Sequence, residues 1–254
     1  MFDTVGALGV PVEPLWRANR ERFAFHSVTL SSITRLNLHA LALDEHRSPF
    51  RATVWRTPPF KRYASRTEQV WFPGAHSDIG GGYIDEERRA AEFRFTLDDI
   101  ALVWMLRRIR AAYPDFPADD AFQPELARDA SESAHRAAAG ATLHDSRTFY
   151  YRLMKNAVRS IANHKVADLA PHEELVGYDR HEDTIGEMVH VSALERRRRD
   201  PQRYAPKNLL SVLPLIRATY AGPAPDALPV VKWDGTAYDP ADPQDCRDVL
   251  ALLG

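Results

Sequence analysis

Hydrophobic residues cluster most clearly over residues 68–72, where Glu-Gln-Val-Trp-Phe carries β-branched and aromatic side chains. Such side chains favour a short buried strand, and Pro73-Gly74 then forces the chain to turn. His76 follows at the predicted exit of the strand, before three consecutive glycines at 80–82. A titratable imidazole on a loop after a strand is typical of a general base in α/β enzymes. The alternative interpretation is a structural loop with a tight glycine turn.

Apolar residues at helical spacing predict helices on both sides of this strand. One helix is expected over residues 31–43, and another is expected from the N-cap residue Thr96 to Tyr113. Further along, residues 125–139 are weakly helical, whereas residues 145–161 place apolar and basic side chains on separate faces. The chain therefore alternates strand and helix signals, which indicates an α/β fold.

Both ends of the chain add short elements. Residues 2–5 look like the last part of a strand, with Asp3 at its exit. The tail is rich in proline, and the Trp-Asp-Gly-Thr turn at 233–236 predicts a small β-hairpin. A short terminal helix is expected over residues 244–253.

Composition sets the bounds of the interpretation. With 254 residues and 44% hydrophobic content, the chain can form one or two domains. A formal net charge of -2 argues against nucleic acid as a partner, and the single cysteine, Cys246, allows no internal disulfide. There is no transmembrane segment and no signal peptide, so a soluble protein, cytoplasmic as made, is expected. Residues 1–113 are predicted to form the α/β core, and residues 114–254 a mostly helical extension with a β-hairpin tail that packs on it.

Several stretches carry a shared pattern in a fixed order. They are FDTVGALG at 2–9, HALALDEHR at 39–47 with Phe50, EQVWFPGAHSDIGGGY at 68–83, LDDIALVWM at 97–105, HVS at 190–192 with Arg196, and YAPKN at 204–208. Together they resemble a family of α/β-hydrolase domains of unknown function that is related to type VI secretion phospholipase effectors. The resemblance implies a partial α/β-hydrolase-like fold, namely the C-terminal portion of the sheet with flanking helices.

The resemblance also implies a catalytic role for two residues. In α/β-hydrolases the nucleophilic Ser, the acid and the His follow one another in that chain order. Asp3 falls at the position of the family's acid, and His76 falls at the position of its His. No Gly-x-Ser-x-Gly occurs in the sequence, so the serine is expected upstream of Met1, and the chain is expected to be inactive alone.

The same resemblance bears on partners and location. A lipid or ester substrate is expected once the N-terminal part is present, with no cofactor. The further expectations are an immunity or secretion-adaptor protein as partner, and delivery out of the cell by type VI secretion.

Other residues of these stretches are expected to support His76. The loop-shaping or substrate-binding candidates are Asp78, Gly80, Gly81 and Gly82, with Asp78 accepting hydrogen bonds from the glycine amides. The candidates for a buried structural network are His39, Asp44 and Arg47. His76, Asp78, Asp44 and His46 could instead be metal ligands, although their spacing is not diagnostic.

Two features near the C-terminus invite a chemical interpretation. His190 and Ser192 suggest a base and a nucleophile, but side chains two residues apart are expected to point away from each other. The arginines at 196–199 are expected to form a solvated helix end, or to meet anionic lipid headgroups.

Two functions from different classes therefore remain open. In the first, the chain supplies the acid and the His of a serine esterase or phospholipase. In the second, it is a non-catalytic relic or an interaction module that binds lipid or a partner protein.

Overall fold

A central parallel sheet organises the protein in a computed structural model. The structure describes residues 1–5, 30, 34–56, 67–83, 96–117, 138–148, 150–178, 183–222, 224 and 227–254. The four strands of the central sheet are β1 (Asn37–Ala42), β2 (Thr67–Phe72), β5 (Glu187–His190) and β6 (Val230–Val231), in the order β1-β2-β5-β6. Every neighbouring pair is parallel, so all four carboxyl ends lie at the same edge of the sheet. Residues 1–3 extend the sheet beyond β1, because Phe2 forms a parallel bridge with Ala40.

Strand β1 corrects the helix that the sequence predicts over residues 31–43. All six of its residues are buried, as expected for a parallel strand that is covered on both faces. Such a strand carries an almost continuous apolar run, and a run of this kind cannot be told from a helix by its periodicity. The predicted strand at 68–72, in contrast, is confirmed as β2.

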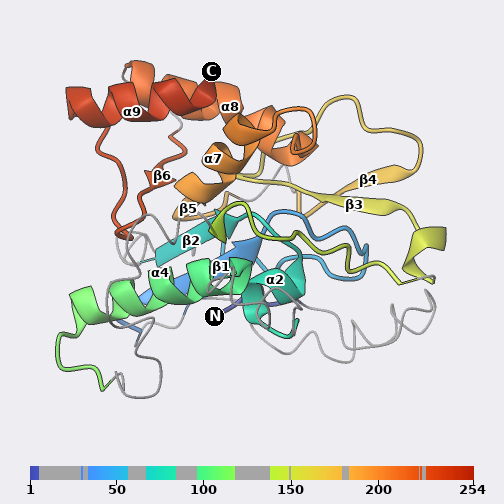
Figure 1. Cartoon of the computed structure of the whole chain (residues 1–254), viewed down its shortest axis with the longest axis horizontal. Coiled ribbons are helices and arrows are strands. Elements are labelled where there is room, and N and C mark those ends of the chain that lie inside the picture. Colours follow the sequence, from blue (N-terminus) through green and yellow to red (C-terminus); the bar gives the residue numbers. More distant parts are fainter. Residues whose placement is uncertain are drawn as a thin grey trace.

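Helices cover this sheet (Figure 1). They are α2 (His76–Gly80), α4 (Leu97–Ala112), α7 (Val191–Arg199), α8 (Lys207–Ala221) and α9 (Pro243–Leu253). In Figure 1, α2 and α4 lie below the strands, and α7, α8 and α9 lie above them. Helix α4 confirms the prediction: Thr96 is its N-cap, and Asp99 completes a capping box. Apolar residues of the strands and of these helices form one hydrophobic core.

A second, smaller sheet replaces the helix predicted over residues 145–161. Strands β3 (Asn156–Arg159) and β4 (Glu173–Val176) pair in parallel, and a single 3₁₀ turn, η2 (Tyr151–Leu153), precedes β3. Ala157, Val158 and Arg159 are all buried, so the apparent separation of apolar and basic faces does not describe this segment. The weak helix predicted over residues 125–139 falls mostly outside the described residues.

The C-terminal residues 227–254 form the predicted hairpin turn and terminal helix. Val231 forms an antiparallel bridge with Ala237, and the Lys232 amide donates to the carbonyl of Thr236 across the turn. Helix α9 then ends the chain. The fold is therefore α/β with parallel sheets. Residues 114–254 were expected to be mostly helical, but they contribute strands β3, β4, β5 and β6 as well as helices α7, α8 and α9. The division at residue 113 stays a prediction. Within the described residues, no helix combines the length and apolar character needed to cross a membrane.

Candidate active site

The candidate site begins where the carboxyl ends of β1 and β2 are held together. The Asp44 amide donates to the carbonyl of Gly74 at 2.9 Å, and the Gly74 amide returns a bond of 2.8 Å to Asp44 Oδ2. Gly74 has a φ of +130°, and a Cβ atom there would lie 2.6 Å from Cβ of Asp78. Only glycine fits this turn without strain, and the turn delivers His76 to the first position of α2.

Asp3 and His76 meet at this edge of the sheet. Asp3 Oδ2 lies 2.7 Å from Nδ1 of His76, with the carboxylate fully buried and the imidazole side chain 29% exposed. Since an ionised carboxylate can only accept, Nδ1 carries the proton of this bond, and Nε2 is left as the basic nitrogen. Residues 73 positions apart thus form an acid–imidazole pair of the kind used in general base catalysis.

A third side chain, Arg159 of β3, completes the surroundings of Asp3. Its guanidinium donates to Asp3 Oδ1 at 2.6 Å and to Oδ2 at 3.0 Å, and it is 1% exposed. The Ala42 amide also donates to Oδ1, at 2.8 Å. Burial by itself would raise the pKa of Asp3, but the charge of Arg159 and the hydrogen bonds from His76 and Arg159 hold that pKa well below its usual range. Asp3 is therefore ionised at neutral pH.

Glu45 supports His76 from the backbone side. Its Oε2 accepts the amide of His76 at 3.2 Å, and the carboxylate is also bound by Arg47 and by the hydroxyl of Ser146. Burial opposes its ionisation, but the hydrogen bonds of Arg47 and the charges of Arg159 and Arg47 bring the pKa of Glu45 below its usual value. The Phe50 ring packs edge-on against the imidazole of His76, with ring centroids 5.5 Å apart. These contacts fix both the main chain and the ring of His76.

Asp78 lies beneath the loop and shapes it. Its Oδ2 accepts the amide of Ala75 at 2.8 Å, and its Oδ1 lies 2.5 Å from Nδ1 of His144. The ring of Tyr83 stacks on that of His144, at a centroid distance of 3.9 Å. Asp78 thus binds Ala75 and His144, whereas the sequence predicted hydrogen bonds from the glycine amides. Burial raises the pKa of Asp78.

The three residues expected to form a structural network lie within β1 and in the segment that follows it. His39 is fully buried, its Nε2 accepts the amide of Thr4 at 3.1 Å, and burial lowers its pKa to about 4. Asp44 Oδ2 also accepts the Tyr204 hydroxyl at 2.9 Å, and burial raises the pKa of Asp44 to about 6. Arg47 binds Glu45, and the central carbon of its guanidinium lies 3.5 Å from the centroid of the Phe50 ring.

The structure does not bring the four candidate metal ligands into one cluster. Asp44 and Asp78 bind the separate partners described above, and Nδ1 of His46 faces the carbonyl of Ala157 at 3.1 Å. Within the described ranges, no group of three or more His, Cys, Asp and Glu side chains is placed to hold a metal ion.

Comparison with known proteins bears on the part of the chain that carries these residues. Residues 1–108 match the catalytic domain of Tle1-like phospholipase effectors of the type VI secretion system. The resemblance seen in the sequence is therefore confirmed for this part of the chain. The matched range contains Asp3, Glu45, His76 and Asp78, whereas Arg159 and His144 lie beyond it. No curated protein and no solved structure matches the chain.

His190 and Ser192 differ from the expectation. The two side chains do not point away from each other, because His190 is the N-cap of α7 and its Nδ1 lies 2.8 Å from the hydroxyl of Ser192. The Ser192 amide bonds to the same nitrogen, at 3.3 Å. Ser192 has no exposed surface, and the His190 ring is stacked on Phe72, so a substrate cannot reach this pair. It caps the helix within the core.

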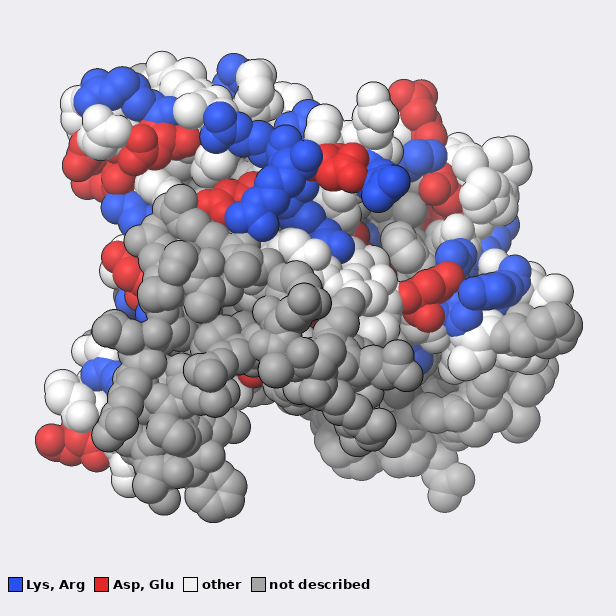
Figure 2. Space-filling model, in the orientation of Figure 1, with Lys and Arg blue, Asp and Glu red and all other residues white. Residues whose placement is uncertain are grey.

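The arginines at 196–199 do not form one solvated face. Arg196 donates to the carbonyls of Ala139 and Ala141, and Arg197 donates to the last turn of α9. Arg198 and Arg199 are exposed. Figure 2 shows basic and acidic side chains intermixed over this region of the surface. A broad cationic surface for lipid headgroups is therefore not seen on this face.

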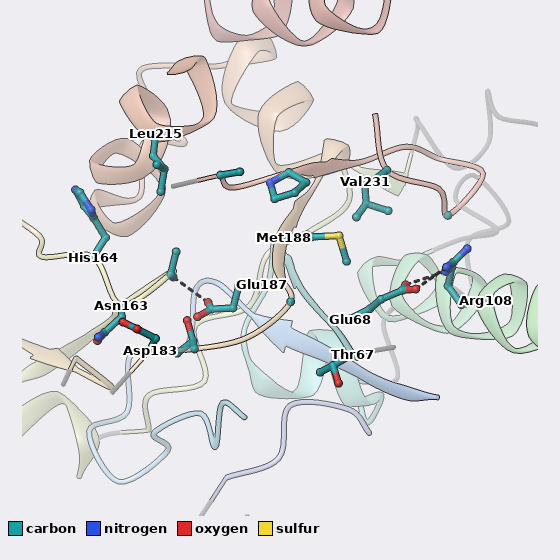
Figure 3. Close-up of a pocket in the computed structure, with 17 residues that line it drawn as sticks. Thr67, Glu68, Arg108, Asn163, His164, Asp183, Glu187, Met188, Leu215 and Val231 are labelled. Carbon is teal, nitrogen blue, oxygen red and sulfur yellow. Dashed lines mark hydrogen bonds and ion pairs between the residues drawn. The ribbon is translucent and has the colours of Figure 1, made fainter. Parts of the chain in front are cut away.

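A cavity of about 850 Å³ lies at the opposite end of the sheet (Figure 3). Thr67 and Glu187, the first residues of β2 and β5, line it, and Arg108 binds Glu68 at its rim with a bond of 2.8 Å. Since His76 follows the carboxyl end of β2, the cavity and the candidate site are separated by the length of the strands. The cavity is not part of that site.

Sequence reasoning missed Arg159, Glu45 and His144. For Arg159 a signal was present, because it is a single charge within the apolar run Ala-Val-Arg-Ser-Ile at 157–161. A charge in a buried strand requires an opposite charge nearby, which would have pointed to an unpaired carboxylate such as Asp3. For His144 the sequence shows no comparable signal.

Proposed function

We propose that this chain supplies the acid and the base of a serine esterase that hydrolyses ester bonds of phospholipids. The observation that carries the proposal is the 2.7 Å contact between Asp3 Oδ2 and His76 Nδ1. It places an ionised carboxylate on one imidazole nitrogen and leaves the other nitrogen basic. The similarity of residues 1–108 to a phospholipase catalytic domain supports phospholipid as the substrate class.

In the proposed reaction, a serine hydroxyl attacks the ester carbonyl carbon while Nε2 of His76 takes its proton. Asp3 stabilises the imidazolium that forms and holds the ring in orientation. His76 then returns the proton to the leaving alcohol, and an acyl-enzyme remains. Water, deprotonated by the same nitrogen, releases the fatty acid.

The serine is proposed to lie N-terminal to Asp3, in the Ser, acid, His order of α/β-hydrolases. The absence of Gly-x-Ser-x-Gly from the 254 residues supports this position. Ser192 is buried, and the hydroxyl of Ser146 is bound to both oxygens of Glu45. An immunity or secretion-adaptor partner, and delivery by type VI secretion, stay predictions that the family match supports only in general terms.

The test is hydrolysis of a short-chain ester and of phospholipid vesicles by the chain alone and by a version extended upstream through its reading frame. We expect activity in the extended protein only, and we expect His76→Ala to lower kcat by about 10³-fold or more. The matched control is His172→Ala, which alters an exposed histidine before β4 and should leave the rate unchanged. If the extended protein hydrolyses neither substrate, the chain is better described as an interaction module or a relic.

A further inference from the structure

Arg159 reaches the candidate site from a part of the chain that the family match does not include. It lies at the end of β3, 156 positions after Asp3. Its guanidinium makes four hydrogen bonds, to the two carboxylate oxygens of Asp3 and to the carbonyls of Ala42 at 2.8 Å and Phe50 at 2.6 Å. The small sheet thereby contributes a buried cation to the edge of the large one.

The geometry of the contact is specific. A planar guanidinium that binds both oxygens of a carboxylate fixes the plane of that carboxylate, which a single lysine donor does not. Asp3 Oδ2 is shared by Arg159 and by Nδ1 of His76. Any rotation of the Asp3 carboxylate would therefore lengthen the bond to His76 and release the imidazole ring.

We infer that Arg159 is a positioning residue of the Asp3–His76 pair, which orients the carboxylate toward the imidazole. The catalytic consequence rests on the proposed function, whereas the effect on the imidazole does not. A purely structural ion pair would anchor β3 through Ala42 and Phe50 and leave the hydrogen bond between Asp3 and His76 unchanged.

Other charges surround the pair and have to be held constant in a test. On the β1 side they are His39 beside Asp3, Glu45 at the His76 amide, and Arg47 bound to Glu45. The Met1 amino group also lies on the β1 side, where it donates to the Leu38 carbonyl near His39. On the α2 side, Asp78 pairs with His144. Arg159→Met leaves all of these side chains in place. Two of them, His39 and Glu45, also feel the charge of Arg159, which lowers the pKa of each.

The experiment follows the downfield NMR resonance of the His76 Nδ1 proton in the labelled chain, with the resonance assigned by its loss in His76→Gln. In Arg159→Met no guanidinium holds the plane of the Asp3 carboxylate. We expect the Nδ1 proton to exchange faster with water, so that its resonance broadens or is lost. An unchanged resonance in folded Arg159→Met overturns the inference.

Arg196→Met is the matched control, because Arg196 also uses its guanidinium to bind main-chain carbonyls but touches no carboxylate of the site. Its His76 Nδ1 proton resonance should equal that of the unaltered chain. If Arg159→Met does not fold, Arg159→Lys keeps the charge but loses the two-pronged bond. The downfield resonance of the His76 Nδ1 proton should then shift or broaden, and an unchanged resonance overturns the inference.

Hydrolysis by the extended protein separates this inference from the proposed function. In an active protein, Arg159→Lys should lower kcat with little change in KM, because it disturbs the base and not the binding of substrate. A shifted His76 resonance without any hydrolysis would leave the inference standing and remove the proposed function. Hydrolysis that depends on His76 but not on Arg159 would support the proposed function and overturn the inference about Arg159.

Discussion

Two buried carboxylates at one edge of the sheet have opposite acidities. Asp3 faces the guanidinium of Arg159 and the imidazole of His76, and its pKa falls well below the usual range. Asp44 is bound by neutral donors, the Gly74 amide and the Tyr204 hydroxyl, and burial raises its pKa to about 6. Burial acts on both residues, so the difference comes from the cation beside Asp3.

The raised pKa of Asp44 predicts how stability depends on pH. In the unfolded chain Asp44 loses its proton near its ordinary value of 3.8, and in the folded chain at about 6. Between these values the unfolded state is the one that has released the proton, so rising pH favours unfolding. The contribution of Asp44 to the free energy of unfolding is fully present below pH 4 and is lost as the pH rises through 6. The loss amounts to about 3 kcal/mol.

Asp44→Asn should remove this part of the pH dependence, because an amide does not ionise and its oxygen can still accept from Gly74 and Tyr204. The measurement is urea unfolding at a series of pH values from 4 to 7 for the variant and the unaltered chain. Asp115→Asn changes an exposed aspartate and should leave the pH dependence of the free energy of unfolding unchanged. If Asp44→Asn showed the same pH dependence as the unaltered chain, the raised pKa of Asp44 would be contradicted.

The candidate site could be predicted from the sequence only in part. Asp3 and His76 were found because they belong to family stretches, and the structure brings them together. Arg159 and His144 belong to no such stretch, and they come close to the site only through the pairing of β3 and the packing of the loop before it. The identity of a partner far along the chain depends on tertiary contacts that local patterns do not contain.

At the scale of elements, exposure explains why helix α4 was predicted and strands β1 and β3 were not. Strand β2 is buried as well, and it was predicted from its β-branched and aromatic side chains and from the Pro-Gly turn after it. Helix α4 has one buried and one half-exposed side, so its periodicity and its Thr96 cap were visible. Strands β1 and β3 are buried almost throughout, so they lack the alternation that identifies a strand.

The pairing of β2 with β5 depends on a glycine. Gly186 has a φ of +61°, and a Cβ atom there would lie 2.0 Å from the carbonyl oxygen of Thr67. Gly186→Ala must therefore displace the backbone of β2 as well as strain its own, which we expect to cost about 3 kcal/mol or more. Urea unfolding of the purified variant measures this loss.

Gly177 supplies the control for that substitution. Its φ is +81°, so alanine is strained there too, but no atom lies within 4 Å of the added Cβ. Gly177→Ala should cost only about 1 kcal/mol, which is the strain alone. Equal losses in the two variants would mean that the contact with Thr67 does not hold the strands in register.

Across the whole molecule, the sheet draws on both ends of the chain. Residues 1–108, which match the phospholipase family, contain β1 and β2, whereas β5 and β6 come from residues beyond 186. Trp71 of β2 donates to Glu187 Oε2 at 2.6 Å, and the side chain of Gln69 binds the carbonyl of Ile185 at 2.7 Å. The family match thus covers one half of a sheet whose other half follows much later in the sequence.

This arrangement yields a test of the predicted division at residue 113. A fragment of residues 1–113 would lose β5 from the edge of β2, the partner of the buried Trp71 indole, and the Arg159 cation that faces Asp3. An unpaired strand with an apolar face and an unpaired buried carboxylate are both costly, so we expect this fragment not to unfold cooperatively in urea.

Near-ultraviolet circular dichroism during urea unfolding makes the comparison, with the full chain as the reference and fragments 1–113 and 114–254 also produced together. We expect a cooperative transition for the full chain, none for either fragment, and partial recovery when the two are co-expressed, because the missing strands are then supplied in trans. A sharp transition for residues 1–113 alone would show that the sheet edge tolerates the loss of β5. In that case the division at residue 113 would mark a true domain boundary.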